Sequence, residues 1–248
     1  MANPQHHPLE LNPRTGEPFL RLKDHKDIII TPPRPDDVVL YPPIMNDPRI
    51  YEWLGPPFPY LTEHAEAWYA KVKASSDVVL AELEAARESP DLLLVGGCPV
   101  RTIRKVQESG EEVYLGDIGI FRCLDGKLMT PVGIPVDDEQ VAEYVETNAA
   151  LAPGNPQIIW TVGDYIVPSH HGQGIMTDAL RTLLWDWAVP RMGVRHIISS
   201  TFEGNEGSVK VLQRNGFVRT RLIKNHVQTR GQWRNLNVME WHRVTNER

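Results

Sequence analysis

The chain has 248 residues, of which 41% are hydrophobic and 23% charged, a composition typical of a globular protein and not of a disordered one. A net charge of −6 and the lack of a basic stripe argue against a nucleic-acid-binding surface, so an anionic ligand must be captured by local groups. The two cysteines cannot form a disulfide framework, no uncharged run reaches the roughly 18 residues of a membrane span, and the N-terminus lacks the apolar core of a secretory signal. We therefore expect a cytoplasmic protein with neither nucleic-acid nor membrane partners.

The N-terminal third is predicted to begin with an arm and to continue into a strand and helices. Residues 1–24 are polar and contain turn signals, which favours an irregular arm. The β-branched run at residues 28–30 predicts a short strand, and Asp36 is suited to cap a short helix after it. A longer helix is predicted over residues 62–87, with Thr62 as its N-cap.

The middle of the chain is predicted to be rich in strands. Residues 91–106 and 111–123 are β-rich and flank a short turn, which predicts a hairpin. Residues 124–157 have the character of an insertion with a short helix, in a place suited to a lid. The strongest strand pattern of the chain follows at residues 157–167.

The C-terminal third alternates strands and helices. A helix reaching about residue 188 follows a glycine-containing turn, and then come a strand at 195–202, a helix at 205–215 and two strands within 217–243. The order of elements predicts an α/β sheet that is mostly antiparallel, with one βαβ unit toward the C-terminus.

The turn with Gly172 and Gly174 lies between a predicted strand and a helix with a wide apolar stripe. The first amides of a helix lack intrahelical acceptors and carry roughly half a positive charge, so they attract anions, and glycine lets a phosphate approach. Thr177 replaces the third glycine of a dinucleotide fingerprint, and no Walker lysine follows. The turn thus favours a pyrophosphate held without a metal, and a purely structural glycine turn is the alternative.

A second motif, NEGSVKVLQRNGF at residues 205–217, places Asn205 after a strand and Ser208 one helical turn further on. Together with VPSHHGQGIMTDAL (residues 167–180) and the segment at 28–69, it resembles the GNAT superfamily of acyl-CoA N-acyltransferases, in particular its RimJ/RimL-like branch.

The resemblance covers residues 25–243 as a single acyltransferase domain and matches the arm at 1–24 and the insertion at 124–157 less well. It implies the GNAT fold, an α/β (α+β) arrangement with a mostly antiparallel mixed sheet of about six to seven strands flanked by helices. In that fold the sheet splays between its fourth and fifth strands.

The resemblance also implies acetyl-CoA as cosubstrate, with its pantetheine arm in the gap between the splayed strands and its pyrophosphate at the glycine turn. Backbone groups before the turn would pair with the pantetheine and polarise the thioester carbonyl. The implied cofactor-binding residues are Ile166, Val167, His171, Gly172, Gln173, Gly174, Ile175, Met176, Asn205 and Ser208.

Two positions depart from the family pattern. Ser169 stands where members often have glutamine or arginine, and Leu212 stands where many have the tyrosine that protonates the departing thiolate. Ser208 is then the nearest side chain that could give this proton, with a water as the alternative.

An alkylammonium acceptor must lose a proton before it attacks, and the candidate bases are Asp164, Glu203 and the pair His170 and His171. Strand alternation puts Asp164 on the same face as Ile166, so its side chain is free to point away from the cleft.

Trp53, Phe58 and Tyr60 are candidates for the acceptor pocket, because their segment commonly faces the substrate in the resembled fold. No ligand cluster with zinc spacing is present, so no metal is expected. The predicted function is direct acetyl transfer to a primary amine, either of a small molecule or of a protein N-terminus. The alternative is a non-catalytic acyl-CoA-binding module, and the oligomeric state is left open, with a homodimer as one alternative.

Overall fold

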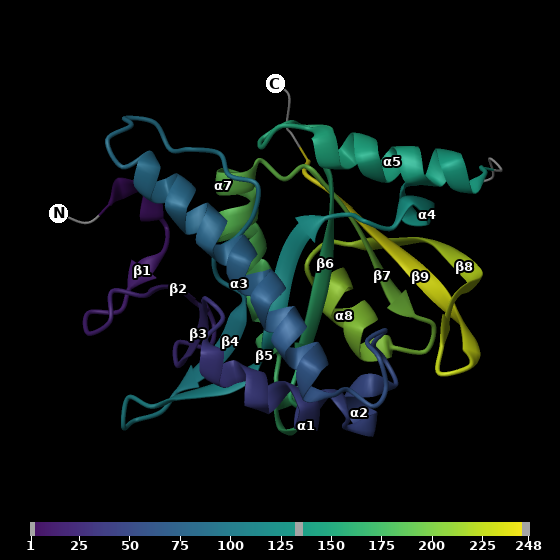
Figure 1. The fold of residues 1–248 in the computed structure, drawn as a ribbon, viewed down its shortest axis with the longest axis horizontal. Coiled ribbons are helices and arrows are strands. Elements are labelled where there is room, and N and C mark those ends of the chain that lie inside the picture. The colour runs from purple at the N-terminus through teal and green to yellow at the C-terminus, as the bar shows by residue number, and fades with distance from the viewer. Residues whose placement is uncertain (1–2, 132–135, 245–248) are drawn as a thin grey trace.

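A computed structural model describes residues 3–131 and 136–244. Its centre is one nine-stranded sheet with the order β1-β2-β3-β4-β5-β6-β7-β9-β8, shown in Figure 1. Neighbouring strands are antiparallel except for β6 and β7, which are parallel. The strands are β1 (Glu10–Leu11), β2 (Pro18–Arg21), β3 (Ile28–Thr31), β4 (Thr102–Val106), β5 (Glu112–Arg122), β6 (Ile159–Ile166), β7 (His196–Phe202), β8 (Val218–Thr229) and β9 (Gln232–His242).

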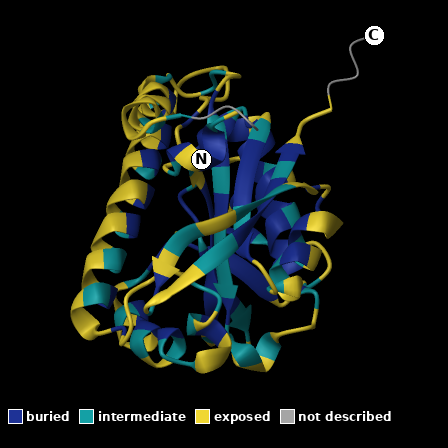
Figure 2. Ribbon diagram, turned by 90° about the vertical axis from the view of Figure 1, so that its right-hand side faces the viewer, coloured by how far each residue is buried: buried dark blue, intermediate teal, exposed yellow. Residues whose placement is uncertain are grey.

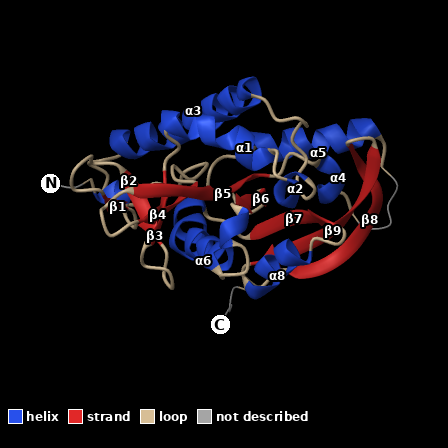
Figure 3. Ribbon diagram, turned by 90° about the horizontal axis from the view of Figure 1, so that it is seen from below, coloured by secondary structure: helices blue, strands red, loops and turns tan. Residues whose placement is uncertain are grey.

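Helices cover both faces of the sheet. Seen from below, α1, α3, α4 and α5 lie on one face, and α6 and α8 lie on the other (Figure 3). None of the helices within the described ranges is long and apolar enough to cross a membrane. The α-helices are α1 (Tyr41–Met45), α2 (Pro48–Tyr51), α3 (Thr62–Ala85), α4 (Gly126–Met129), α5 (Asp138–Ala150), α6 (Ile175–Thr182), α7 (Val189–Met192) and α8 (Glu206–Arg214), and the shorter or irregular helices are η1 (Pro4–His6), η2 (Pro35–Leu40), η3 (Pro168–His170) and the π-helix η4 (Leu183–Ala188).

The segment predicted to be an irregular arm contributes two strands to the sheet. Strand β2 pairs with β3, and its Phe19 and Leu20 are buried, so the N-terminal segment completes the core at this edge. Arg191 is fully buried and donates hydrogen bonds to the carbonyls of Gln5 and His7, which ties the start of the chain to α7. The prediction missed these strands because both are short and lie among prolines and turn residues.

Two other boundaries differ from those predicted. Of residues 91–106, only the part from Thr102 is a strand, because the stretch before it runs along α7, where the Val95 amide bonds to the Arg191 carbonyl. The helix after the glycine turn passes residue 188 as α6, η4 and α7, and Pro190 is tolerated because it lies in the first turn of α7.

The predicted splay is confirmed, but the sheet has nine strands and not about six to seven, so the splay lies between its sixth and seventh strands, β6 and β7, and not between the fourth and fifth. These strands pair only through Ile159 with His196 and Trp160 with Ile197, and they separate beyond that point. The helices α6 and α8, which follow β6 and β7, pack against each other on one face of the sheet. Figure 2 shows buried strands at the centre of the molecule, whereas exposed residues lie on the outer faces of the helices, on loops and along β8. The splay therefore opens the sheet between the C-terminal parts of β6 and β7.

Candidate active site

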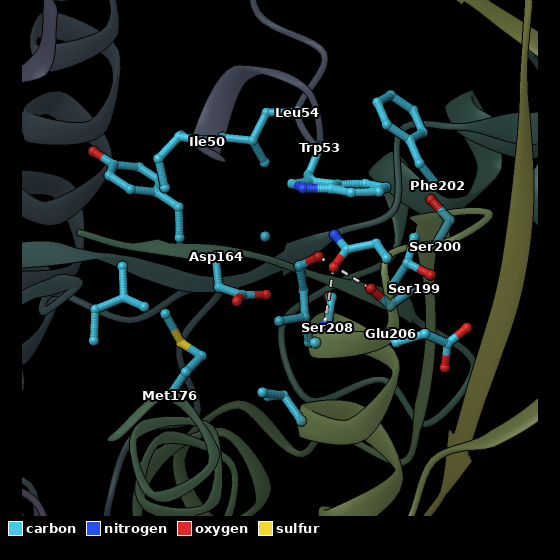
Figure 4. A pocket seen from close by; sticks show the side chains of 18 of the residues that line it. Ile50, Trp53, Leu54, Asp164, Met176, Ser199, Ser200, Phe202, Glu206 and Ser208 are labelled. Carbon is cyan, nitrogen blue, oxygen red and sulfur yellow. Dashed lines mark hydrogen bonds between the residues drawn. The ribbon is translucent and has the colours of Figure 1, made fainter. Parts of the chain in front are cut away.

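A cavity of about 1150 Å³ begins where β6 and β7 separate. Its walls come from the end of β6, the glycine turn, β7 and the start of α8, with the α2 region above it, as Figure 4 shows. Its lining residues include Trp53, Asp164, Ile166, His171, Gly172, Gly174, Ile175, Met176, Ser199, Asn205 and Ser208.

The backbone of β6 presents alternate residues to this gap. The Val167 amide donates to the Leu115 carbonyl at 2.7 Å, so Val167 faces β5. In antiparallel strands, residue pairs that hydrogen-bond each other alternate with pairs whose N–H and C=O groups point away from the partner strand. Asp164 and Ile166 belong to pairs of the second kind, so their N–H and C=O groups point away from β5 and into the gap. The expectation that Val167 would pair with the pantetheine is therefore wrong, and Val167 does not line the cavity.

Two carbonyls at the gap already have partners. The Ile166 carbonyl accepts a hydrogen bond from His171 Nε2 at 2.8 Å, and the Val162 carbonyl accepts one from the Ser199 hydroxyl at 3.1 Å. His171 and Ser199 thus donate the hydrogen bonds that a neighbouring strand would otherwise give to these two carbonyls. His171 belongs to the motif at residues 167–180, whereas Ser199 lies within a strand, where a serine carries no sequence signal of such a role.

The glycine turn has the geometry of an anion site. Gly172 and Gly174 have φ of 75° and 81°, a left-handed conformation that favours glycine, and Gly174 is the N-cap of α6. The amides of Ile175 and Met176 lie in the first turn of α6 and have no intrahelical acceptor. Gln173 does not line the cavity, since its side chain donates to the Ser169 carbonyl.

A histidine from the N-terminal part of the chain holds the turn in place. His25 Nδ1 lies 3.0 Å from the Asp178 carboxylate on α6, and its Nε2 lies 3.1 Å from the Gln173 carbonyl. The amides of Asp24 and His25 donate to the same carboxylate oxygen. Although burial alone would raise it, these hydrogen bonds bring the pKa of Asp178 below its ordinary value. Sequence reasoning missed this contact, because about 150 residues separate the partners.

The start of α8 forms the opposite wall. Asn205 caps the helix by accepting a hydrogen bond from the Ser208 amide at 3.2 Å, and Ser208 lines the cavity beside it. Lys210 and Arg214 also line the cavity and supply positive charge in a chain that is acidic overall. Leu212 is buried in the core, and its hydrocarbon side chain has no proton to donate to a thiolate.

Asp164 lies where the larger cavity meets a second one. Figure 4 shows its carboxyl group pointing into the gap, between Trp53 and Leu54 on one side and Met176 on the other. Burial, and after it the negative charge of Asp117, raise the pKa of Asp164 to about 6. The structure gives this carboxyl no ion pair among the residues it describes.

Strand alternation left open whether Asp164 points toward or away from the cleft, and the structure places it in the cavity lining. Five consecutive residues, 162–166, line the cavity, so the cavity reaches residues on both faces of β6. It does so because it opens across the edge of the strand, where the neighbouring strand has separated.

Glu203 and Phe58 lie outside both cavities. Glu203 is exposed, and its carboxylate accepts a hydrogen bond from Asn235 at 2.8 Å. Phe58 is exposed and packs on Tyr51, with ring centroids 4.5 Å apart. The structure therefore brings neither residue to the reaction centre proposed from the sequence.

The second cavity, of about 560 Å³, lies between α3 and the edges of β5 and β6. It shares Leu54, Gly163, Asp164 and Tyr165 with the larger cavity. Of the three acceptor candidates, Trp53 lines the larger cavity and Tyr60 lines this one. The other lining residues are Met45, Pro56, Pro57, His64, Ala67, Trp68, Lys71, Arg101, Asp117 and Phe121.

One group of three potential metal ligands, not anticipated from the sequence, occurs in the described part of the chain. His196, Glu240 and His242 lie on β7 and β9, and Glu240 Oε2 is 3.5 Å from Nε2 of each histidine. The two imidazole rings are stacked with centroids 4.0 Å apart. None of the three lines either cavity.

Comparisons with known proteins identify the family and the fold of the chain. The family model described as acetyltransferase (GNAT) domain matches residues 27–218. Probable N-acetyltransferase YjcK from Bacillus subtilis (strain 168) is 31% identical over 78 residues, which are 32% of this chain and 42% of YjcK, so less than half of that relative is matched.

Two solved structures show the same fold at low sequence identity. RimL, a ribosomal L7/L12 alpha-N-protein acetyltransferase in complex with coenzyme A, has a TM-score of 0.56 at 14% identity, over 90% of this chain and 97% of its own. Mycobacterium smegmatis RimJ in complex with CoA-disulfide has a TM-score of 0.52 at 16% identity, over 92% and 87%. With a family model that covers more than half of its length, the chain belongs to the GNAT acetyltransferase family.

Proposed function

We propose that the protein transfers an acetyl group from acetyl-CoA directly to the nitrogen of a primary amine. The observation that carries the proposal is the position of Asp164, where the gap between β6 and β7 meets the second cavity. Its carboxyl has a raised pKa and no ion-pair partner among the described residues. A thioester in the gap and an amine in the second cavity would meet at this residue.

The cosubstrate would be held mainly by main-chain groups. The N–H and C=O groups of Asp164 and the N–H of Ile166 point into the gap and suit the amides of a pantetheine arm. The amides at the start of α6 suit the pyrophosphate, and Lys210 and Arg214 suit a further phosphate. The relatives RimL and RimJ, whose structures contain coenzyme A, support this assignment.

The reaction needs a base, a place for negative charge and a proton for the leaving group. Asp164 would take a proton from the ammonium, whose ordinary pKa is about 10.4, and so free the nitrogen to attack the thioester carbonyl. A backbone N–H in the gap would stabilise the oxyanion, a contribution of roughly 3 kcal/mol in other enzymes. Collapse of the intermediate expels the thiolate, which Ser208 or a water then protonates.

Direct transfer is favoured because no thiol is available to carry the acetyl group. Cys123 is buried, and neither it nor Cys98 lines a cavity. Burial also raises the pKa of the Cys98 thiol to about 12, which leaves it protonated and weakly nucleophilic.

The proposed acceptors are small amines and protein N-termini, the second because RimL is named for the alpha-amino group of a ribosomal protein.

Within the insertion, Asp125 and Lys127 line the larger cavity, while no residue of α5 lines either cavity. We place the activity in a single domain spanning residues 25–243, with the N-terminal strands attached to its sheet edge.

The test is the release of free thiol from acetyl-CoA by the purified protein, with and without a panel of amines. Amine-stimulated release, with the acetylated amine identified by mass spectrometry, supports the proposal. Calorimetric binding of acetyl-CoA without turnover for any amine would instead indicate the alternative function, an acyl-CoA-binding module.

A further inference from the structure

The second cavity keeps most of its polar groups engaged with one another. Arg101 donates two hydrogen bonds to Asp117, at 2.7 and 2.6 Å, and both side chains are largely buried. The Arg101 guanidinium also lies 4.9 Å from the centre of the Trp68 ring. This ion pair therefore forms a neutral, closed unit in the wall and leaves no charge of its own for a ligand.

Two further polar groups in the wall are also satisfied. The Tyr60 hydroxyl donates to the His64 carbonyl at 3.1 Å, and His64 Nδ1 accepts from the Leu61 amide at 3.0 Å. Asp164 and Lys71 are the main polar side chains left free in the described wall, so a peptide main chain or a polyhydroxylated group placed here would lose more hydrogen bonds to water than it gains. The surface that remains for a ligand is apolar, with Met45, Leu54, Pro56, Trp68 and Phe121 among its side chains.

The charges around the cavity fit one ammonium group and disfavour a second. Asp164, at the junction with the larger cavity, is the one lining carboxyl without a cationic partner among the described residues. Away from it, the wall contains Lys71, whose Nζ lies 5.9 Å from the centre of the Trp68 ring, and the already paired Arg101. A second positive charge on the acceptor would face Lys71 without a free counter-charge among the described lining residues, because Asp117 is already paired with Arg101.

We propose that the acceptor is a small aromatic monoamine: a primary amine on a short linker that ends in a flat apolar ring. The amine would lie at Asp164, and the ring would fill the space between Trp68, Leu54 and the proline pair 56–57. The inference rests on the proposed acetyl transfer and narrows its substrate. It favours such amines over polyamines and over peptide N-termini.

The first test compares acceptors at saturating acetyl-CoA. The kcat/KM for 2-phenylethylamine should exceed that for 1,5-diaminopentane, and for a short peptide with an N-terminal phenylalanine, by at least about tenfold. Equal or higher values for the diamine or the peptide overturn the inference and leave acetyl transfer intact. Binding of acetyl-CoA with no turnover of any amine removes the proposed function as well.

The second test changes the charge at the exposed position 71. Lys71→Glu should lower the ratio of kcat/KM for the aromatic amine over the diamine by at least about fivefold, since it gives the second ammonium a partner. Lys73→Glu, on the same helix but outside the cavity, should leave the ratio unchanged. A ratio that is the same in both variants and the wild type overturns the charge assignment, and circular dichroism confirms that both variants are folded.

Discussion

Asp164 combines two properties that a general base needs at neutral pH. Burial and the nearby charge of Asp117 raise its pKa to about 6, so it accepts a proton more readily than an ordinary aspartate does. At pH 7 it is still mostly ionised and therefore ready to act. A carboxyl at the usual value near 3.8 would be a weaker base in the same place.

Asp164→Asn should lower kcat by roughly a hundredfold or more, while the dissociation constant for acetyl-CoA stays within about twofold, because the variant keeps the backbone but loses the base. The wild-type rate should fall as the pH drops below about 6, where Asp164 takes up a proton. Steady-state kinetics from pH 5 to pH 9 and calorimetry measure these effects. Glu203→Gln is the matched control, and an equal loss in this variant would contradict the assignment of the base.

The same residue should make the protein less stable at neutral pH. Its folded-state pKa lies above the ordinary value near 3.8, so ionisation costs stability as the pH rises from about 4 to about 6, and the loss is complete above that range. Asp164→Asn removes this cost, so its Tm should exceed that of the wild type at pH 7.5 and match it near pH 4. A difference that does not depend on pH would show that ionisation is not its cause.

At the scale of the element, the start of α6 depends on glycine at its N-cap. Gly174 has a φ of 81°, and its Cβ position points toward open space with only His25 nearby, at 3.8 Å. An anion would approach the amides of α6 through this opening.

Gly174→Asp should raise the dissociation constant for coenzyme A by at least about tenfold, because its carboxylate competes with the pyrophosphate for the amides of α6. Gly16→Asp controls for backbone strain, since Gly16 has a similar φ of 74° in an exposed turn. Isothermal titration calorimetry measures both, and equal affinity in the two variants would refute the anion site.

Gly116 sets the approach of β5 to β6 beside the cavity. A Cβ there would lie 2.2 Å from the Tyr165 carbonyl oxygen and 2.9 Å from the Ile166 Cα. Gly116→Ala should therefore destabilise the protein by about 1–3 kcal/mol and weaken coenzyme A binding by displacing the end of β6. Gly119→Ala on the same strand meets no atom closer than 3.5 Å and should change stability by less than about 0.5 kcal/mol in urea unfolding. Similar losses in both variants would contradict this packing argument.

At the scale of the whole molecule, the N-terminal segment closes one edge of the sheet. Its removal would uncover the edge of β3, expose the surface under Leu20 and Leu22, and leave buried Arg191 without the carbonyls of Gln5 and His7.

Deletion of residues 3–22 should destabilise the protein by roughly 3 kcal/mol or more and promote association through the exposed strand. Thermal unfolding and light scattering measure the two effects. Arg21→Ala, which removes the partly exposed ion pair with Glu10, a hydrogen bond to the Lys26 carbonyl and the contact with the Phe19 ring, should cost clearly less than the deletion, about 1 kcal/mol. An unchanged Tm after the deletion would show that the segment is dispensable.

The sequence predicts the elements that its local pattern determines. The splayed strand pair, the helix at Glu206–Arg214 and the final hairpin have clear periodicity and punctuation, with Gly174 and Gly216 at left-handed positions. The strands of the N-terminal segment escape prediction because their stability comes from β3 and not from their own residues.

The candidate site is predictable only in part, for a related reason. The glycine turn, Asn205 and Ser208 belong to contiguous motifs, and the structure places them along one cavity. The second cavity joins Met45, Trp68 and Asp117, which only the packing of α3 on the sheet brings together. The backbone direction of Val167 depends on its register against β5, which no local pattern specifies.

The short contact between β6 and β7 divides the sheet into two blocks, β1–β6 and β7–β9, joined along a seam of only two residue pairs. Beyond these two pairs, the backbone N–H and C=O groups that face the gap and have no side-chain partner need hydrogen bonds from water. A pantetheine bound there would connect the two blocks through hydrogen bonds. These hydrogen bonds would form when acetyl-CoA binds and break when coenzyme A leaves, so the link between the two blocks would change in every turnover.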